Sequence, residues 1–252
     1  MTVQLHHTED GPAGAPALVL GSALGTTGAM WQPQMPALTP HFRVFRYDHR
    51  GHGKSPAPEG PYSIADMGRD LLALLDRLQL RRVHLGGLSL GGMVGMWVAA
   101  HAPSRVDRLA LLCTSALLGP PSRWSERADT VRAGGMAAVA DGVVARWFSP
   151  AFAATHAAVV GWASSMLLAA PVAGYAACCG AIQTMDLTGD LAAIEAPTLA
   201  VAGTLDEATP PSHLSLLASR IASARYTEVP AAHLANVEQP SLVGDLLLDF
   251  LS

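Results

Sequence analysis

The sequence contains few charged residues and few cysteines. Only 14% of its 252 residues are charged, the formal net charge is −4, and lysine and arginine do not cluster beyond local pairs. This balance argues against a nucleic acid or an anionic membrane surface as a partner. The three cysteines, at positions 113, 178 and 179, show no CxxC spacing and make a poor disulfide framework. We therefore expect reduced thiols, a cytoplasmic location, and neither a metal nor a cofactor.

The sequence also lacks a long uninterrupted hydrophobic run. The segment 1–10 is polar and has no signal-peptide pattern. The alanine-rich segment 151–181 is interrupted by serine, glycine and proline, and its longest clean run falls short of the roughly 20 residues that a membrane span needs. Half of the residues are nevertheless hydrophobic, which suffices for the core of one large domain. We expect a globular protein with no membrane segment.

Short apolar runs alternate with helical patterns along most of the chain. An edge strand is expected at 3–7, and further strands at 17–21, 42–48, 83–85, 106–113, 197–203 and 225–229. From position 63 onward, apolar residues recur at helical spacing, and Ser63 is placed to cap that helix. Strands that alternate with helices form right-handed βαβ units. The sequence therefore predicts an α/β fold, with a mostly parallel central sheet and helices on both faces.

The alternation stops between about 116 and 189. This region has no strand-like run and consists of alanine-rich helical sequence with tryptophans, punctuated by glycine and proline. The rhythm of strand and helix resumes at position 197. We expect a helical cap at about 116–189, inserted in a single domain that spans residues 1–252 and covering the site that the sheet forms.

The pentapeptide Gly87-Leu88-Ser89-Leu90-Gly91 carries the clearest chemical signal. An apolar strand precedes it and a helical sequence follows it, which is the setting of a nucleophile elbow. Such a turn presents the serine hydroxyl at the end of a strand, where the N-terminus of the next helix stabilises negative charge. Larger side chains in place of the flanking glycines would clash. Because the bare pattern also arises by chance, partners elsewhere in the chain have to support it.

Asp206 and His233 are the expected partners of Ser89. Each follows directly after one of the last two expected strands. Ligand sites in open α/β sheets lie beyond the carboxyl ends of the strands, so the three side chains would meet at one edge. A serine hydroxyl needs a base to accept its proton, and a carboxylate orients that base and stabilises its charged form. Glu207, the neighbour of Asp206, is the alternative acid.

Two backbone N–H groups are expected to bind the oxyanion that forms when an ester carbonyl is attacked. One belongs to Leu90, directly after the serine. The other belongs to Leu24, in the glycine-containing loop 21–25.

The segment Asp48–Ser55 follows another expected strand, and its repeated glycines indicate a tight turn. We expect Asp48 to anchor this turn by hydrogen bonds, as short acidic side chains often do. His49 and His52 lie in the same turn, so we expect them to support the site and not to act as its base.

These residues resemble the motifs of the α/β-hydrolase superfamily across nearly the whole chain. Within it, the sequence is similar to the 3-oxoadipate enol-lactonases. Three features carry this resemblance: the loop Leu24-Gly25-Thr26 followed by Met30-Trp31, the cap segments 124–127 and 131–136, and the cap segment 175–181 with Met185-Asp186-Leu187. Ser22-Ala23 departs from the Asn-Ser of that family, but the oxyanion donor is a backbone group and is retained.

The resemblance implies hydrolysis of the cyclic enol ester β-ketoadipate enol-lactone to 3-oxoadipate in aromatic catabolism. The free carboxylate of this substrate needs a cation, and a bidentate arginine would suit it. The residues expected to contact a small anionic lactone are Trp124, Arg127, Arg132 and Trp147; the cap also contains Arg123 and Arg146. Solvation of a helix face is the alternative for each arginine, and packing between cap and body is the alternative for the tryptophans.

Two other functions stay open. A broad carboxylesterase or a cofactor-free perhydrolase would share Ser89, Asp206 and His233 and would differ in the cap. A non-catalytic ligand-binding member of the fold would need none of the three, and the complete set argues against it. The sequence does not indicate the oligomeric state.

Overall fold

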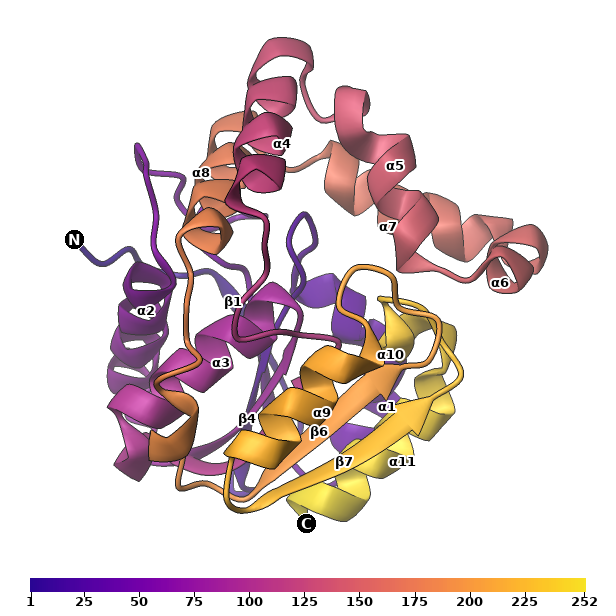
Figure 1. Cartoon of the computed structure of the whole chain (residues 1–252). Coiled ribbons are helices and arrows are strands. Elements are labelled where there is room, and N and C mark those ends of the chain that lie inside the picture. Colours follow the sequence, from indigo (N-terminus) through magenta and orange to yellow (C-terminus); the bar gives the residue numbers. More distant parts are fainter.

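A central sheet of seven strands organises the molecule (Figure 1). The computed structural model describes residues 1–252. The strand order is β1-β3-β2-β4-β5-β6-β7, and only β1 runs antiparallel to its neighbour. The strands are β1 (His7–Asp10), β2 (Ala17–Gly21), β3 (Arg43–Tyr47), β4 (Val83–Leu88), β5 (Val106–Leu112), β6 (Thr198–Gly203) and β7 (Ala224–Val229). The predicted α/β fold with a mostly parallel sheet is confirmed.

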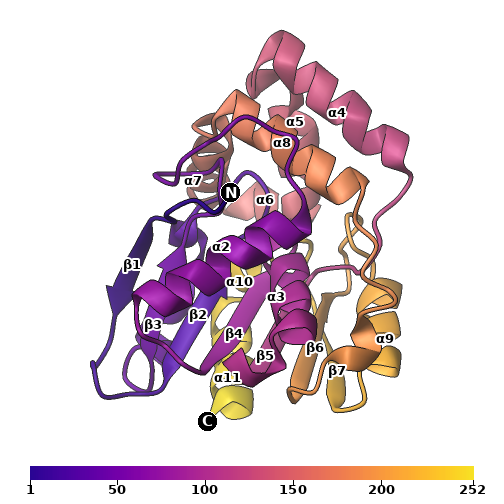
Figure 2. The ribbon, with the colours of Figure 1, turned by 90° about the vertical axis from the view of Figure 1, so that its left-hand side faces the viewer.

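Helices cover both faces of this sheet (Figure 2). One face carries α2 (Ile64–Arg77), α3 (Leu90–His101) and α9 (Pro211–Arg220), and the other carries α1 (Met35–Leu38) and α11 (Pro240–Leu251). Every residue of β4 and of β6 is buried, as expected for parallel strands that are covered on both sides. The prediction that Ser63 caps the N-terminus of α2 is confirmed, because the Ser63 hydroxyl accepts from the Asp66 N–H and the Asp66 carboxylate accepts from the Ser63 N–H.

The first strand lies later in the chain than the sequence predicted. The expected edge strand at 3–7 is wrong, since β1 begins only at His7, where pairing with Tyr47 of β3 starts. The preceding residues are held by side chains and by one backbone bond, in which the Asp48 N–H donates to the His6 carbonyl at 3.0 Å. The Val3 N–H donates to the Asp70 carboxylate at 2.8 Å, and the His6 N–H donates to the Ser55 hydroxyl at 2.9 Å. Weak alternation in a short polar segment could not show which residues face a partner strand.

Five α-helices lie between β5 and β6 in the chain and stand above the carboxyl ends of the strands (Figure 1). We call them the cap: α4 (Pro121–Gly134), α5 (Ala137–Trp147), α6 (Pro150–Thr155), α7 (Ala157–Leu168) and α8 (Val172–Gln183). Helices α4 and α8 pack side by side in both ribbon views. An antiparallel bridge between Leu117 and Asp186 joins the two ends of the insertion where it meets the sheet.

No single helix is long and apolar enough to cross a membrane. Helices α7 and α8 reach the required length and hydrophobicity only as a pair, and they meet at an angle of 92°. Most of α8 is buried in the interior of the protein, including Tyr175, Cys178 and Cys179. All three cysteines are free and buried, and no group of His, Cys, Asp and Glu side chains is arranged to hold a metal ion.

Candidate active site

Ser89 occupies a sharp turn between β4 and α3. Its backbone angles are φ 56° and ψ −116°, a conformation that costs energy for any residue with a side chain. The surrounding backbone fixes this turn: the Ser89 N–H donates to the Leu112 carbonyl at 3.0 Å, and the Thr114 hydroxyl donates to the Ser89 carbonyl at 2.7 Å. The strained geometry is therefore held from both sides, as expected of a nucleophile elbow.

The glycines around Ser89 allow backbone segments to pack directly on each other. A Cβ atom on Gly87 would lie 2.3 Å from the carbonyl carbon of Gly91. A Cβ atom on Gly91 would lie 2.2 Å from the carbonyl oxygen of Gly21 at the end of β2. No side chain fits at either position, so the predicted steric role of these glycines is confirmed.

His233 and Asp206 form a buried pair at the ends of β7 and β6. The Nδ1 atom of His233 lies 2.8 Å from Oδ2 of Asp206. The same carboxylate accepts from the Ala208 N–H at 2.8 Å and from the Thr209 N–H and hydroxyl at 3.0 and 2.7 Å. Burial raises the pKa of Asp206, but attraction to His233 and these hydrogen bonds outweigh burial and hold the pKa below its usual value. Asp206 therefore stays ionised and fixes the hydrogen of His233 on Nδ1.

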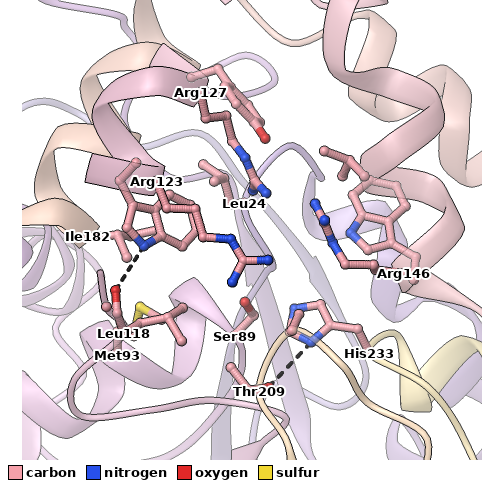
Figure 3. Close-up of a pocket in the computed structure, with 16 residues that line it drawn as sticks. Leu24, Ser89, Met93, Leu118, Arg123, Arg127, Arg146, Ile182, Thr209 and His233 are labelled. Atoms are coloured by element: carbon pink, nitrogen blue, oxygen red, sulfur yellow. Dashed lines mark hydrogen bonds between the residues drawn. The ribbon is translucent and has the colours of Figure 1, made fainter. Parts of the chain in front are cut away.

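The structure brings Ser89, His233 and Asp206 to one cavity (Figure 3). Ser89 and His233 face each other across its floor. Their side chains make no direct hydrogen bond, an arrangement often seen before a substrate binds. With Nδ1 bound to Asp206, the lone pair of His233 Nε2 is free to take a proton from a nucleophile. The alternative acid, Glu207, makes no hydrogen bond to His233.

The two N–H groups expected to bind an oxyanion have no partner within the protein. In the loop beside the elbow, the N–H groups of Ala23, Gly25 and Thr26 all donate, and the N–H of Leu24 does not. At the elbow, the Leu90 N–H begins α3 and is likewise free. Free N–H groups beside a serine hydroxyl are available to an anionic oxygen.

Asp48 anchors the turn that it begins, as predicted. Its carboxylate accepts from the Lys54 N–H at 3.0 Å and from the Gly28 N–H at 2.9 Å. The Ser55 hydroxyl donates to the Asp48 carbonyl at 2.6 Å and closes the turn. Asp48 lines no part of the cavity above Ser89.

The cavity above Ser89 encloses about 660 Å³, including its open mouth. Three of the four cap residues predicted to contact a substrate line it: Trp124, Arg127 and Trp147. Arg132 does not. Its side chain is 58% exposed and pairs with Asp129 at 2.8 Å, because five residues after Arg127 a helix has turned away from the cavity. The prediction for Arg132 is corrected on this ground.

Three arginines of the cap line the cavity without an acidic partner. Arg123 and Arg127 lie one turn apart on α4, and Arg146 lies on α5; Figure 3 shows all three pointing into the space above Ser89. None of them forms an ion pair; Arg127 lies 4.8 Å above the centre of the Trp124 ring and close to the Tyr175 hydroxyl. Burial, and repulsion from Arg127 and Arg123, lower the pKa of Arg146. Three like charges that repel one another are a site prepared for an anion.

Tyr175 of α8 is a cavity residue to which the sequence assigned no role. The side chain is fully buried, and its hydroxyl has no hydrogen-bond partner. Burial raises the pKa of Tyr175 to about 12, although the nearby Arg127 charge acts in the opposite direction. The hydroxyl is therefore a neutral donor that a ligand in the cavity can satisfy. Its place in the cap segment 175–181, which carried the family resemblance, was the available signal.

Comparison with known proteins identifies the class. A family model described as "alpha/beta hydrolase fold" matches residues 16–240. The fold and the residues at its site define a carboxylic ester hydrolase, and the chain belongs to the α/β-hydrolase family.

The relatives narrow this class. The chain is 37% identical to 3-oxoadipate enol-lactonase 2 of Acinetobacter baylyi over 94% of its own length and 89% of that protein. It superposes on the crystal structure of the enol-lactonase from Burkholderia xenovorans LB400 with a TM-score of 0.97 and 41% identity, covering 99% and 96% of the two chains. It is also 34% identical, over 98% of its length and 96% of the relative, to a protein of Variovorax paradoxus named as a carbamate hydrolase, RutD.

Proposed function

We propose that this protein opens β-ketoadipate enol-lactone to 3-oxoadipate, as a cytoplasmic step of aromatic catabolism. The similarity to proteins named enol-lactonases supports this substrate. So does the chemistry of the cavity, which combines the groups needed to attack an ester with cations for a carboxylate. The proposed residues are Ser89 as nucleophile, His233 as base and Asp206 as the acid that orients it.

In the first half of the reaction, Ser89 attacks the lactone carbonyl while its proton passes to His233 Nε2. The N–H groups of Leu90 and Leu24 donate to the oxygen that becomes negatively charged. The ring C–O bond then breaks, and the enol oxygen leaves with the proton from His233. The leaving group stays attached to the acyl chain, and its conversion to the ketone removes the nucleophile that could close the ring again.

In the second half, water attacks the acyl-enzyme and gives one proton to His233. That proton returns to the Ser89 oxygen as the acyl C–O bond breaks. Asp206 remains ionised throughout, because its lowered pKa keeps it charged beside the imidazolium that forms in both halves. The steps use only groups of the chain and water.

The observation that carries the choice of substrate is the set of unpaired arginines above Ser89. A neutral ester would leave Arg123, Arg127 and Arg146 facing one another without an ion-pair partner, because the attraction of Glu207 for Arg146 is weaker than the repulsion from Arg127 and Arg123. A lactone with a free carboxylate supplies the missing negative charge and can accept from the Tyr175 hydroxyl as well. The cavity therefore favours a small ester with an anionic arm.

The test compares three substrates on the wild-type protein: the enol-lactone, the neutral ester p-nitrophenyl acetate, and a carbamate. We expect kcat/KM for the enol-lactone to exceed that for the neutral ester by about 100-fold or more, and Ser89→Ala to abolish both activities. A preference for the neutral ester would show a broad carboxylesterase. A preference for the carbamate would assign the function of the RutD relative.

A further inference from the structure

Two buried histidines form hydrogen bonds to the backbone of the loop that carries Leu24. The N–H of Gly25 donates to Nε2 of His52 at 2.9 Å. Nε2 of His49 lies 3.0 Å from the carbonyl oxygen of Ser22. Both imidazoles belong to the Asp48–Ser55 turn, and both are fully inside the protein. The loop beside the elbow is therefore fixed at both ends by side chains that the reaction scheme does not use.

The hydrogen bonds define how each ring is protonated. Because Nε2 of His52 accepts from a backbone N–H, its ring hydrogen lies on Nδ1, which faces the Arg50 carbonyl at 3.3 Å. The Cys178 thiol of the cap lies 3.9 Å from the same Nδ1 atom. Burial lowers the pKa of His52. The ring is thus neutral, and Nε2 is available as an acceptor.

The bond to His52 fixes the peptide between Leu24 and Gly25, which is joined through the Leu24 Cα atom to the peptide that carries the Leu24 N–H. Gly25 has a φ of +82°, and a Cβ atom there would lie 2.5 Å from Leu167 and 3.1 Å from the Tyr175 ring. The loop is therefore enclosed by the cap on one side and by His52 on the other. A rotation of the peptide that frees the Gly25 N–H from His52 would leave that group buried without a partner.

We propose that His52 is a positioning residue, which holds the Leu24 N–H in the orientation that binds the oxyanion. The inference rests on the proposed function only in using ester hydrolysis through Ser89, and not on the identity of the substrate. The proposal predicts that loss of the His52 bond weakens stabilisation of the transition state more than binding of the substrate, because the carbonyl oxygen of the bound substrate carries less negative charge and needs the oxyanion donors less.

Two conservative variants distinguish the contributions of the two ring nitrogens of His52, because each variant replaces only one of them. The amide of His52→Gln reaches the position of Nε2 and can still accept from Gly25. The shorter amide of His52→Asn reaches only the position of Nδ1, so it keeps the contact with the Arg50 carbonyl and loses Gly25. His84→Asn, at a buried histidine within β4 and away from the cavity, is the control for loss of a packed ring.

The assay is hydrolysis of p-nitrophenyl acetate, with active sites counted by a phosphonate that labels Ser89. We expect His52→Asn to lower kcat per active site by about 10- to 100-fold with little change in KM, and His52→Gln and His84→Asn to stay within about threefold of wild type. Affinity for phenylboronic acid, whose tetrahedral adduct on serine places an oxygen in the oxyanion site, should fall with kcat in His52→Asn alone. Equal losses in His52→Gln and His52→Asn, or a wild-type kcat in His52→Asn, would overturn the proposal. Because the ester is neutral, failure of the enol-lactone proposal would not affect this result.

Discussion

Replacement of Arg146 by methionine tests how the cavity recognises its substrate. Methionine keeps most of the length of the side chain and removes the charge. In the free protein the guanidinium is half-buried and is repelled by Arg127 and Arg123, which together lower its pKa. The substitution should therefore cost little stability, and the relief of repulsion even favours the folded state.

The effect on catalysis follows from the energy of one charged contact. A hydrogen bond to a charged group contributes about 1.5–3 kcal/mol, which corresponds to a fall of about 10- to 150-fold in kcat/KM for the anionic lactone. Hydrolysis of p-nitrophenyl acetate, which has no carboxylate, should change by less than about threefold. The selectivity between the two esters is therefore the quantity that Arg146→Met alters.

The matched control is Arg132→Met on the neighbouring helix. Arg132 is exposed, pairs with Asp129 and lies outside the cavity, so both substrates should react as in the wild type. Steady-state rates of the two variants with both substrates, at low ionic strength, complete the comparison. Equal behaviour of Arg146→Met and Arg132→Met toward the lactone would refute the assignment of the cap arginines to the substrate carboxylate.

Three further predictions concern the catalytic pair, the elbow and stability in acid. Asp206→Asn should lower kcat by about 10³- to 10⁴-fold at unchanged fold, because the amide no longer fixes the tautomer of His233, and circular dichroism beside the kinetics checks both points. Gly91→Ala should destabilise the protein by about 3 kcal/mol, since its Cβ atom would meet a backbone oxygen at 2.2 Å, whereas Gly142→Ala, with open space around it in a helix, should be neutral or stabilising in the same urea titration. Burial lowers the pKa of His49 from 6.5 to about 3. As the pH falls below 6.5, His49 therefore becomes protonated in the unfolded chain but stays neutral in the folded protein. Stability should therefore decrease on acidification by about 1.4 kcal/mol per pH unit from this residue, and a urea stability that stays constant between pH 7 and pH 5 would contradict that burial.

The sequence was sufficient for the six parallel strands of the sheet and for the chain order of the site, but not for the antiparallel edge strand β1. Parallel strands buried on both faces are apolar throughout, so they are visible as short runs between turns. Ser89 and Asp206 follow two such strands, and His233 follows β7, an edge strand that is largely exposed. The rule that sites lie at the carboxyl ends of parallel strands brings the three together without knowledge of the packing. The oxyanion donors that we propose followed in a similar way: Leu90 from its place directly after Ser89, and Leu24 from the loop at the carboxyl end of β2.

The cap was less predictable because its chemistry depends on helix phase and on packing between helices. Arg123 and Arg127 are four residues apart and share a face of α4, whereas Arg132 lies on another face. Arg146 joins the first two only through the placement of α5 over the strand ends (Figure 1). Tyr175 required the structure, because an unpaired hydroxyl is visible only once its surroundings are known.

The most direct test of the account is the mass of the protein during turnover. Ring opening of a lactone by Ser89 releases no separate leaving group, so the acyl-enzyme should be heavier than the free protein by the full mass of the substrate. We predict that rapid mixing with enol-lactone followed by acid quenching gives this adduct on a peptide containing Ser89, and that Ser89→Ala gives none. Rapid hydrolysis of the lactone by Ser89→Ala, or an adduct on another residue in the wild-type protein, would contradict the account.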